Sequence, residues 1–321
     1  RHQRIAAAVV GIVVFVVPAA WFLSTGGRSD RNQTPAATGP TVIPDTVPGP
    51  FFLDLATGVR TPLAASLAGG HSYVASPDGT KLVYGLSRKE GCSALDVTTV
   101  ANIDGTDARV LQPPDELDIC GARWSPDGTA LVYQLRNGAA PYSVGNLFVE
   151  DLSSGRTTQI TDLELTKAWW WFLFPSFSPD GRKVIFHLPR TESKTTEWDV
   201  WSVPVHGGEP TLLVRDASFP MLNPGFVPEG SAIAFLSPRR SGFDGKSIDT
   251  GRPIAGADIR HTLVEANTAI WWPTMSPGGT RIAYQDGGSI YVADIETGES
   301  SKVAEGDTAE WLDGTTLIVT P

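Results

Sequence analysis

A four-residue segment, Ser125-Pro126-Asp127-Gly128, recurs along the chain and restricts its possible folds more than any other feature. The other copies, some degenerate, are Ser76-Pro77-Asp78-Gly79, Ser178-Pro179-Asp180-Gly181, Val227-Pro228-Glu229-Gly230, Ser276-Pro277-Gly278-Gly279 and Leu312-Asp313-Gly314. Proline fixes φ, aspartate accepts local backbone hydrogen bonds and glycine tolerates positive φ, so each copy predicts a tight turn. The first five copies are 49 to 53 residues apart. A constant period of about this length indicates a repeat fold such as a β-propeller.

Each turn lies between two segments that are typical of buried strands. The residue before the turn is always apolar, and the strand after it ends in an aromatic residue in five of the six copies. The residues of these two columns are Ala75, Trp124, Phe177, Phe226, Met275 and Trp311, then Tyr84, Tyr133, Phe186, Phe235, Tyr284 and Val319. Second hairpins follow, such as residues 147–155 and 290–298. Nearly continuous apolar runs are typical of strands that are covered on both faces, as in a stack of blades.

The two ends of the repeat region complete the count of blades. Residues 51–63 resemble an outer hairpin without an inner pair before it, and residues 308–320 an inner pair without an outer hairpin after it. Pairing of 51–63 with 308–320 builds one blade from both ends of 51–321 and leaves no open sheet edge. We therefore predict an all-β fold, a six-bladed β-propeller of four-stranded antiparallel blades. The 33 glycines and 25 prolines suit a chain with many tight turns.

The segment before the repeats predicts a membrane anchor. Residues 5–23 are uncharged and mostly apolar, and as a helix they span about 28 Å, roughly one hydrocarbon core. Residues 1–4 are then a short cytoplasmic stub, because the large domain after the helix is the part that crosses the membrane. Residues 24–50 contain five prolines and predict an extended linker. A cleaved signal peptide is the alternative, although the run is long for one and no clear A-x-A site follows it.

The repeat resembles that of the TolB-type propellers, which are related to the WD-repeat propellers. The resemblance rests on the aromatic-Ser-Pro-Asp-Gly turn and on Ile290-Tyr291-Val292-Ala293-Asp294 with its Thr-Gly turn, and it covers residues 51–321. It implies an extracytoplasmic binding platform in bacteria that faces other envelope proteins. The anchored layout is similar to that of actinobacterial proteins, including anti-sigma regulators with one membrane span and an external propeller. The separate N-terminal α/β domain of TolB has no counterpart in this sequence.

Long insertions predict which face of the propeller binds. The tight turns share one face, and the insertions fall on the other, between the second and third strands of a blade or between blades. Loops on a rigid scaffold are frequent binding sites, and Trp and Arg are frequent anchors of interfaces. The alternative is that these indoles pack under the loops. The candidate contacts are Trp169, Trp170, Trp171, Trp198, Arg239, Arg240, Trp271 and Trp272.

The two cysteines, Cys92 and Cys120, fit no zinc or redox motif, because they are not paired as C-x-x-C. Both are expected in loops of the insertion-rich face, Cys120 in the loop that enters the second blade. Outside the cytoplasm they form a candidate disulfide. Two small buried thiols are the alternative.

Motifs of catalysis are missing from the sequence. It contains no G-x-S-x-G, P-loop, G-x-G-x-x-G or H-E-x-x-H motif, and its dispersed histidines predict no metal site and no cofactor. The net charge of −10 argues against nucleic acid as a partner.

We therefore expect a non-enzymatic sensing or binding module, anchored in the cell membrane by one helix, with its propeller outside the cytoplasm. Its partner is expected to be a protein or an envelope ligand that contacts the insertion-rich face. One alternative is a propeller enzyme, a saccharide lyase or a hydrolase, that acts at the central funnel. Another is a structural spacer in an envelope complex. An enzyme needs clustered His or carboxylate groups with perturbed pKa values, whereas a binding module needs only an exposed aromatic face.

Overall fold

The computed structural model describes the residues 48–86, 97–113, 118–136, 145–163, 173–189, 198–217, 225–226, 233–238, 245–251, 260–265 and 270–321. The chain divides into two compact units, residues 1–42 and 43–321, and all described residues belong to the second. The predicted stub 1–4, the predicted membrane helix 5–23 and most of the linker 24–50 lie outside these ranges. Among the described residues, no helix is long and apolar enough to cross a membrane.

The described strands form six four-stranded sheets in which all neighbouring strands are antiparallel. The first three sheets along the chain begin at β3, β7 and β11. Their strands are β3 (His71–Ala75), β4 (Lys81–Leu86), β5 (Val97–Asn102), β6 (Arg109–Val110), β7 (Asp118–Trp124), β8 (Ala130–Arg136), β9 (Leu147–Asp151), β10 (Thr157–Gln159), β11 (Ser176–Phe177), β12 (Lys183–Pro189), β13 (Trp198–Pro204) and β14 (Thr211–Ala217).

Two further sheets follow in the same up-and-down order, and the remaining one combines strands from both ends of the repeat region. Their strands are β15 (Gly225–Phe226), β16 (Ile233–Pro238), β17 (Gly245–Gly251), β18 (Arg260–Glu265), β19 (Ile270–Met275), β20 (Arg281–Asp286), β21 (Ser289–Asp294), β22 (Ser300–Glu305), β23 (Thr308–Trp311), β24 (Thr316–Thr320), β1 (Phe51–Asp54) and β2 (Arg60–Pro62).

The mixed sheet has the order β2-β1-β24-β23. Strand β1 pairs antiparallel with β24, so that Phe51 lies opposite Val319 and Asp54 opposite Thr316. The first and last described strands of the chain are thus hydrogen-bonded neighbours.

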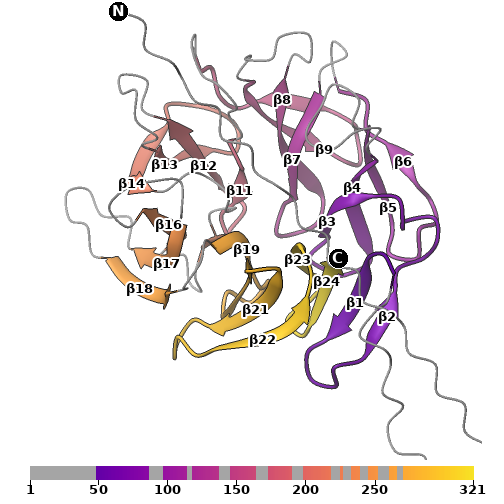
Figure 1. Cartoon of the computed structure of the whole chain (residues 1–321). Helices are drawn as coiled ribbons and strands as arrows, with labels where there is room; N and C mark the ends of the chain where they lie inside the picture. The colour runs from indigo at the N-terminus through magenta and orange to yellow at the C-terminus, as the bar shows by residue number, and fades with distance from the viewer. Residues whose placement is uncertain are drawn as a thin grey trace, which may run out of the picture. The chain divides into compact units, whose positions relative to one another are not determined.

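The sheets stand next to one another as the blades of a propeller (Figure 1). Contacts between β23 and β3, β3 and β7, and β7 and β11 join successive sheets near the axis. Contacts of β14 with β16, β17 with β19 and β19 with β23 continue this order back to the mixed sheet. The first strand of each sheet along the chain, or β23 in the mixed sheet, is the innermost one.

The core lies in layers between neighbouring blades. Val83 and Val100 of one blade pack with Trp124, Leu131 and Tyr133 of the next. Further layers of the same kind join the sheet of β7–β10 to that of β11–β14, and the sheet of β19–β22 to the mixed one. The sheets of β3–β6 and β7–β10 are therefore covered on both faces, which is the physical reason for the apolar runs in their sequence.

The repeated turns also touch one another. A Cβ placed on Gly128 would lie 3.7 Å from Cδ of Pro77 in the preceding blade, and one on Gly181 would lie 3.7 Å from Cδ of Pro126. Both glycines have positive φ, 70° and 67°. The backbone conformation therefore favours glycine here, whereas a Cβ would make only an ordinary van der Waals contact with the neighbouring turn.

Candidate functional site

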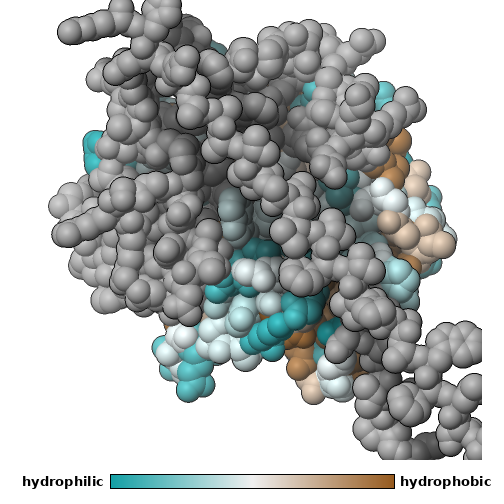
Figure 2. All heavy atoms as spheres, in the orientation of Figure 1, coloured by the Kyte–Doolittle hydropathy of each residue, from teal (hydrophilic) through white to brown (hydrophobic). Residues whose placement is uncertain are grey.

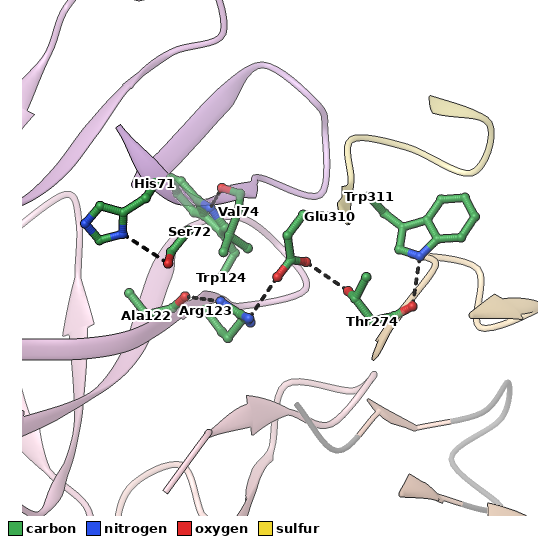
Figure 3. A network of polar contacts seen from close by, with 9 residues as sticks. All are labelled: His71, Ser72, Val74, Ala122, Arg123, Trp124, Thr274, Glu310 and Trp311. Atoms are coloured by element: carbon green, nitrogen blue, oxygen red, sulfur yellow. Dashed lines mark hydrogen bonds and ion pairs between the residues drawn. The ribbon is translucent and has the colours of Figure 1, made fainter. Parts of the chain in front are cut away.

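Three polar side chains from three different blades meet near the axis of the propeller (Figure 3). Arg123 of β7 donates from Nη2 to Oε1 of Glu310 in β23, at 3.0 Å. Thr274 of β19 donates from Oγ1 to the other carboxylate oxygen of Glu310, at 2.9 Å. All three residues occupy the same place in the repeat, two residues before the first position of the turn. That shared register explains why strands far apart in the sequence present side chains that meet.

This cluster is satisfied by its own members. The second guanidinium nitrogen of Arg123, Nη1, donates to the carbonyl of Ala122 at 3.0 Å. The side chains of Arg123 and Glu310 are only 19% and 21% exposed. A partly shielded ion pair with further hydrogen bonds stabilises the arrangement of the inner strands, and it offers no unpaired group for acid or base chemistry.

Two tryptophans next to this layer connect neighbouring blades. Nε1 of Trp124 donates to the carbonyl of Val74 in the preceding blade at 3.0 Å, and Nε1 of Trp311 donates in the same way to the carbonyl of Thr274 at 3.0 Å. Both indoles are buried. They belong to the apolar column that precedes the turns, so in these two blades that column provides a hydrogen bond between blades as well as apolar contact.

The other end of the innermost strands has an unusual backbone. Ser72, Phe174 and Trp272 have φ of 54°, 42° and 46°, and Gly121 has φ of 64°. Each lies four residues before the serine of its turn. In β3, β7 and β19 the strand register shifts at this place, as in a β-bulge. The repeat thus places one left-handed residue at the loop end of these innermost strands, whatever the side chain.

In the blade of β19–β22 this end of the strand presents two tryptophans to solvent. The side chains of Trp271 and Trp272 are 40% and 42% exposed, whereas Pro273 and Thr274, which follow them, are buried. Trp271 lies opposite Gln285 of β20. A left-handed conformation is costly for a bulky residue, and the surrounding strand pairing holds it here.

Three carboxylates lie at strand ends on the same side of the propeller as this tryptophan pair. Asp286 ends β20 opposite Ile270, and burial raises the pKa of its side chain. Glu305 ends β22, and its ion pair with Lys302 lowers the pKa of its carboxyl group. Asp307 precedes β23, where its backbone N–H donates to the carbonyl of Thr320 at 2.8 Å.

The remaining predicted contacts have different outcomes. Trp169, Trp170, Trp171, Arg239, Arg240 and Cys92 lie outside the described residues. Trp198 begins β13 with a fully buried side chain, so its assignment to an exposed face is corrected.

Cys120 lies within strand β7, not in the loop before it as expected, because the strand begins at Asp118. Its side chain is buried. Cys92 is not described, so the disulfide between the two cysteines stays a prediction.

The histidine His187 shows how apolar this end of a blade is. Its side chain in β12 is fully buried, and desolvation lowers its pKa to about 3. Among the residues that the structure describes, no three His, Cys, Asp or Glu side chains form a group that would hold a metal ion. At the loop end of β19 the exposed groups are the aromatic rings of Trp271 and Trp272, which are side chains suited to binding.

The Arg123–Glu310–Thr274 cluster and the carboxylates at the loop end were not predicted. A signal was present in the sequence: aligned on the turn, the inner-layer column contains Val74, Arg123, Ser176, Gly225, Thr274 and Glu310. Charged residues in a strand of otherwise apolar character indicate a shared environment. Which of them pair depends on the order of the blades around the axis.

Comparison with known proteins supports the fold. No family model matches the chain. An uncharacterized protein of Agrobacterium fabrum is 26% identical over 59% of this chain and 56% of its own length. The Tol-Pal system protein TolB of Francisella tularensis is 26% identical over 58% of this chain and 49% of its own. The chain thus spans about half the length of these curated relatives.

Among solved structures, TolB from Acinetobacter baumannii superposes with a TM-score of 0.53 at 17% identity, over 80% of this chain and 65% of that one. This is a likeness of fold. The chain has the fold of a β-propeller of four-stranded antiparallel blades, similar to that of TolB.

Proposed function

We propose that this chain is a non-catalytic binding module, with a six-bladed propeller outside the cytoplasm and one membrane helix at residues 5–23, and that its insertion-rich face recognises a protein of the cell envelope. The observation that carries the proposal is the exposed pair Trp271 and Trp272 at the loop end of β19. Large apolar side chains at the rim of a rigid scaffold are typical of interaction sites.

Two further observations support this assignment. The described strands form six four-stranded sheets, and the β1–β24 pairing joins the ends of the repeat region, which gives a stiff platform without an open edge. A curated relative is named as a Tol-Pal system protein, which favours a protein partner in the envelope.

Site-specific photocrosslinking in cells tests the binding face. A photoreactive phenylalanine analogue replaces Trp271 in one protein and Glu296, an exposed residue in the turn after β21, in the matched control. We expect a crosslinked protein partner from the first position and none from the second. Binding of the purified partner to the full chain should weaken when Trp271 is changed to Ala. Equal crosslinking from both positions, or binding that Trp271→Ala leaves unchanged, contradicts the proposal.

The membrane anchor is tested separately. We expect the full chain to stay with membranes after alkaline carbonate extraction, and a variant without residues 5–23 to be released. A full chain that carbonate extracts completely contradicts the anchor but leaves the binding face unaffected.

A further inference from the structure

We infer that the loop end of the blade of β19–β22 binds an extended segment of the partner protein through the side-chain amide of Gln285. A backbone N–H of the segment donates to Oε1 of Gln285, and a large apolar side chain of the segment packs against Trp271 and Trp272. The inference deepens the proposed function and rests on it, because it says how the partner of the same face is held. Another blade makes the same kind of contact within the chain.

Gln285 and Gln134 are equivalent residues of two repeats. Each lies nine residues after the first position of its turn. Gln134 lies opposite Cys120 of the innermost strand, and Gln285 lies opposite Trp271. Residues directly opposite each other on neighbouring antiparallel strands project from the same face of the sheet. The two amides therefore have the same place at the loop ends of their blades.

The chain itself binds the amide of Gln134. Its Oε1 accepts the backbone N–H of Leu173 at 3.1 Å, and its Nε2 donates to the carbonyl of Gly145 at 3.4 Å. Leu173 belongs to the segment that enters the next blade, and its side chain is fully buried in an apolar cluster with Leu147. Cys120 is only 2% exposed. A backbone N–H and an apolar side chain thus fill the loop end of this blade together.

The amide of Gln285 has no such contact. Its Oε1 is buried and has no hydrogen-bond partner among the described residues. Trp271, which has the position of Cys120, is 40% exposed. A buried acceptor without a donor destabilises a fold, and a donor from another chain would remove this loss. The terminal torsion of glutamine is broadly allowed, so Oε1 can turn toward a donor that approaches beside Trp271.

The connection to the next blade explains this difference. The connection from β10 to β11 is long, residues 160–175, and includes Leu173. The connection from β22 to β23 consists only of Gly306 and Asp307. The backbone N–H groups of these two residues already donate to carbonyls, at 3.1 and 2.8 Å. This short connection therefore has no backbone N–H left for Gln285.

These features fit an extended polypeptide segment with a large apolar residue. Extended backbone supplies N–H groups whatever its sequence, and its side chains supply the specificity. Figure 2 shows that the described surface over β21 and β22 is mostly hydrophilic. Within the described part of this blade, the exposed large apolar side chains are Trp271 and Trp272. The apolar contact is therefore confined to the loop end of β19, beside Gln285.

The test uses the purified full chain in lipid nanodiscs and three synthetic peptides. The first copies residues 172–176, which include Leu173. The second carries an N-methyl group on the leucine nitrogen, and the third has alanine in place of the leucine. Isothermal titration should show binding of the first peptide and about three- to tenfold weaker binding of the other two. The inference is overturned if the first peptide does not bind or if the N-methyl peptide binds equally well.

Variants of Gln285 locate the contact. Gln285→Leu removes the acceptor, so it should weaken the first peptide about three- to tenfold and bind it no better than the N-methyl peptide. Gln285→Glu keeps an acceptor and should bind the first peptide more tightly than Gln285→Leu does. Glu296→Leu, a change at the turn end of the same blade, is the matched control and should leave binding unchanged. Equal binding by Gln285→Leu and the control overturns the inference.

Thermal unfolding compares the two equivalent glutamines without any ligand. Gln285→Leu removes a buried acceptor that has no donor among the described residues, so the unfolding midpoint should stay the same or rise. Gln134→Leu leaves the N–H of Leu173 without its acceptor, so the midpoint should fall. Equal falls in the two variants would mean that Gln285 is bound within the fold, and would overturn the inference.

The outcome separates this inference from the proposed function. If position 271 crosslinks to a partner in cells and Gln285→Leu does not reduce the yield, the face binds its partner without this contact and only the inference is rejected. If position 271 fails to crosslink, the proposed binding face fails with it.

Discussion

The two ends of the innermost strands follow different rules. At the turn end, the serine hydroxyl donates to the aspartate at 2.6 Å in all three full copies of the turn, Ser76 to Asp78, Ser125 to Asp127 and Ser178 to Asp180. In each copy the same hydroxyl accepts a backbone N–H at 2.9 Å. At the loop end, the corresponding positions of different blades share only a left-handed backbone, with Ser72, Gly121, Phe174 and Trp272 as side chains.

This difference indicates that the turn end serves the stability of the fold, whereas the loop end is available for recognition. At the turn end the serine and aspartate side chains are hydrogen-bonded to each other and to the two residues that follow the glycine, and the glycines of the second and third copies lie near the proline of the preceding turn, so the side chains are fixed by the fold. At the loop end the fold specifies a backbone conformation and leaves the side chain open. Different side chains at the loop ends of the repeats are therefore compatible with binding. Different side chains at the turn ends would destabilise the fold.

The first prediction concerns Trp124, whose buried indole connects two blades between the turn end and the loop end. Trp124→Ala removes a buried indole and leaves the carbonyl of Val74 without its donor. We expect the free energy of unfolding to fall by about 3–5 kcal/mol, measured by chemical denaturation. Trp124→Phe keeps most of the ring and should cost less. A loss of about 1 kcal/mol or less in Trp124→Ala would show that the indole does not connect the blades.

The second prediction separates the two ends by pH. His187 lies toward the loop end of β12, and burial lowers its pKa from 6.5 to about 3. Below pH 6.5 the imidazole of His187 is protonated in the unfolded chain but stays neutral in the folded chain. Stability is therefore lost as the pH falls from 6.5 toward 3. The slope should approach about 1.4 kcal/mol per pH unit. His187→Leu should flatten this part of the stability profile; an unchanged slope would contradict the assignment.

The turn end should respond only in stronger acid. Hydrogen bonds from serine or threonine hydroxyls and backbone N–H groups lower the pKa of Asp78, Asp127 and Asp180 below 3.8, and that of Asp151 to about 2. The contribution of these aspartates to stability is fully present above pH 3.8. It is lost as the pH falls through their lowered pKa values in the folded state. Asp127→Asn should therefore reduce the loss of stability below pH 3.8 without altering the profile above it.

The third prediction concerns the layer between the two ends. Arg123→Met and Glu310→Gln each disturb the ion pair across the axis, and each should destabilise the fold. The double variant should be more stable than the sum of the two losses predicts, with a coupling of about 1 kcal/mol. A denaturation cycle on the four proteins measures this coupling. Strictly additive losses would mean that the 3.0 Å contact has no energetic effect.

The sequence was sufficient for the parts of the fold that repeat. The Ser-Pro-Asp-Gly turns and the aromatic ends of the second strands have local physical causes, and the prediction of an all-β propeller of four-stranded antiparallel blades is confirmed. The exposure of Trp271 and Trp272 agrees with the expected face, but the indole of Trp198 is buried. Sequence alone does not separate these cases, because the start of a strand and the end of an insertion differ by a few residues.

The bulges were harder to foresee for a related reason. A left-handed residue is signalled by glycine, as at Gly121, but not by serine, phenylalanine or tryptophan. The pairing of Arg123 with Glu310 depends on contacts between blades far apart in the sequence. Both features come from the closed arrangement of the blades and have no local pattern.

The last prediction concerns the left-handed position at the loop end and involves the smallest expected change in stability. Trp272 is 42% exposed and has φ of 46°. Trp272→Gly loses part of an indole contact but relieves the left-handed backbone, so the free energy of unfolding should change by about 1 kcal/mol or less. Trp272→Val keeps an apolar side chain but places a β-branched residue at positive φ, and should cost about 1–2 kcal/mol more than the glycine variant. At the turn end Gly128→Val should be destabilising as well, because it places a β-branched residue at φ of 70°. If Trp272→Val is as stable as Trp272→Gly, the bulge does not impose the left-handed conformation, and the loop end is no freer than the turn end.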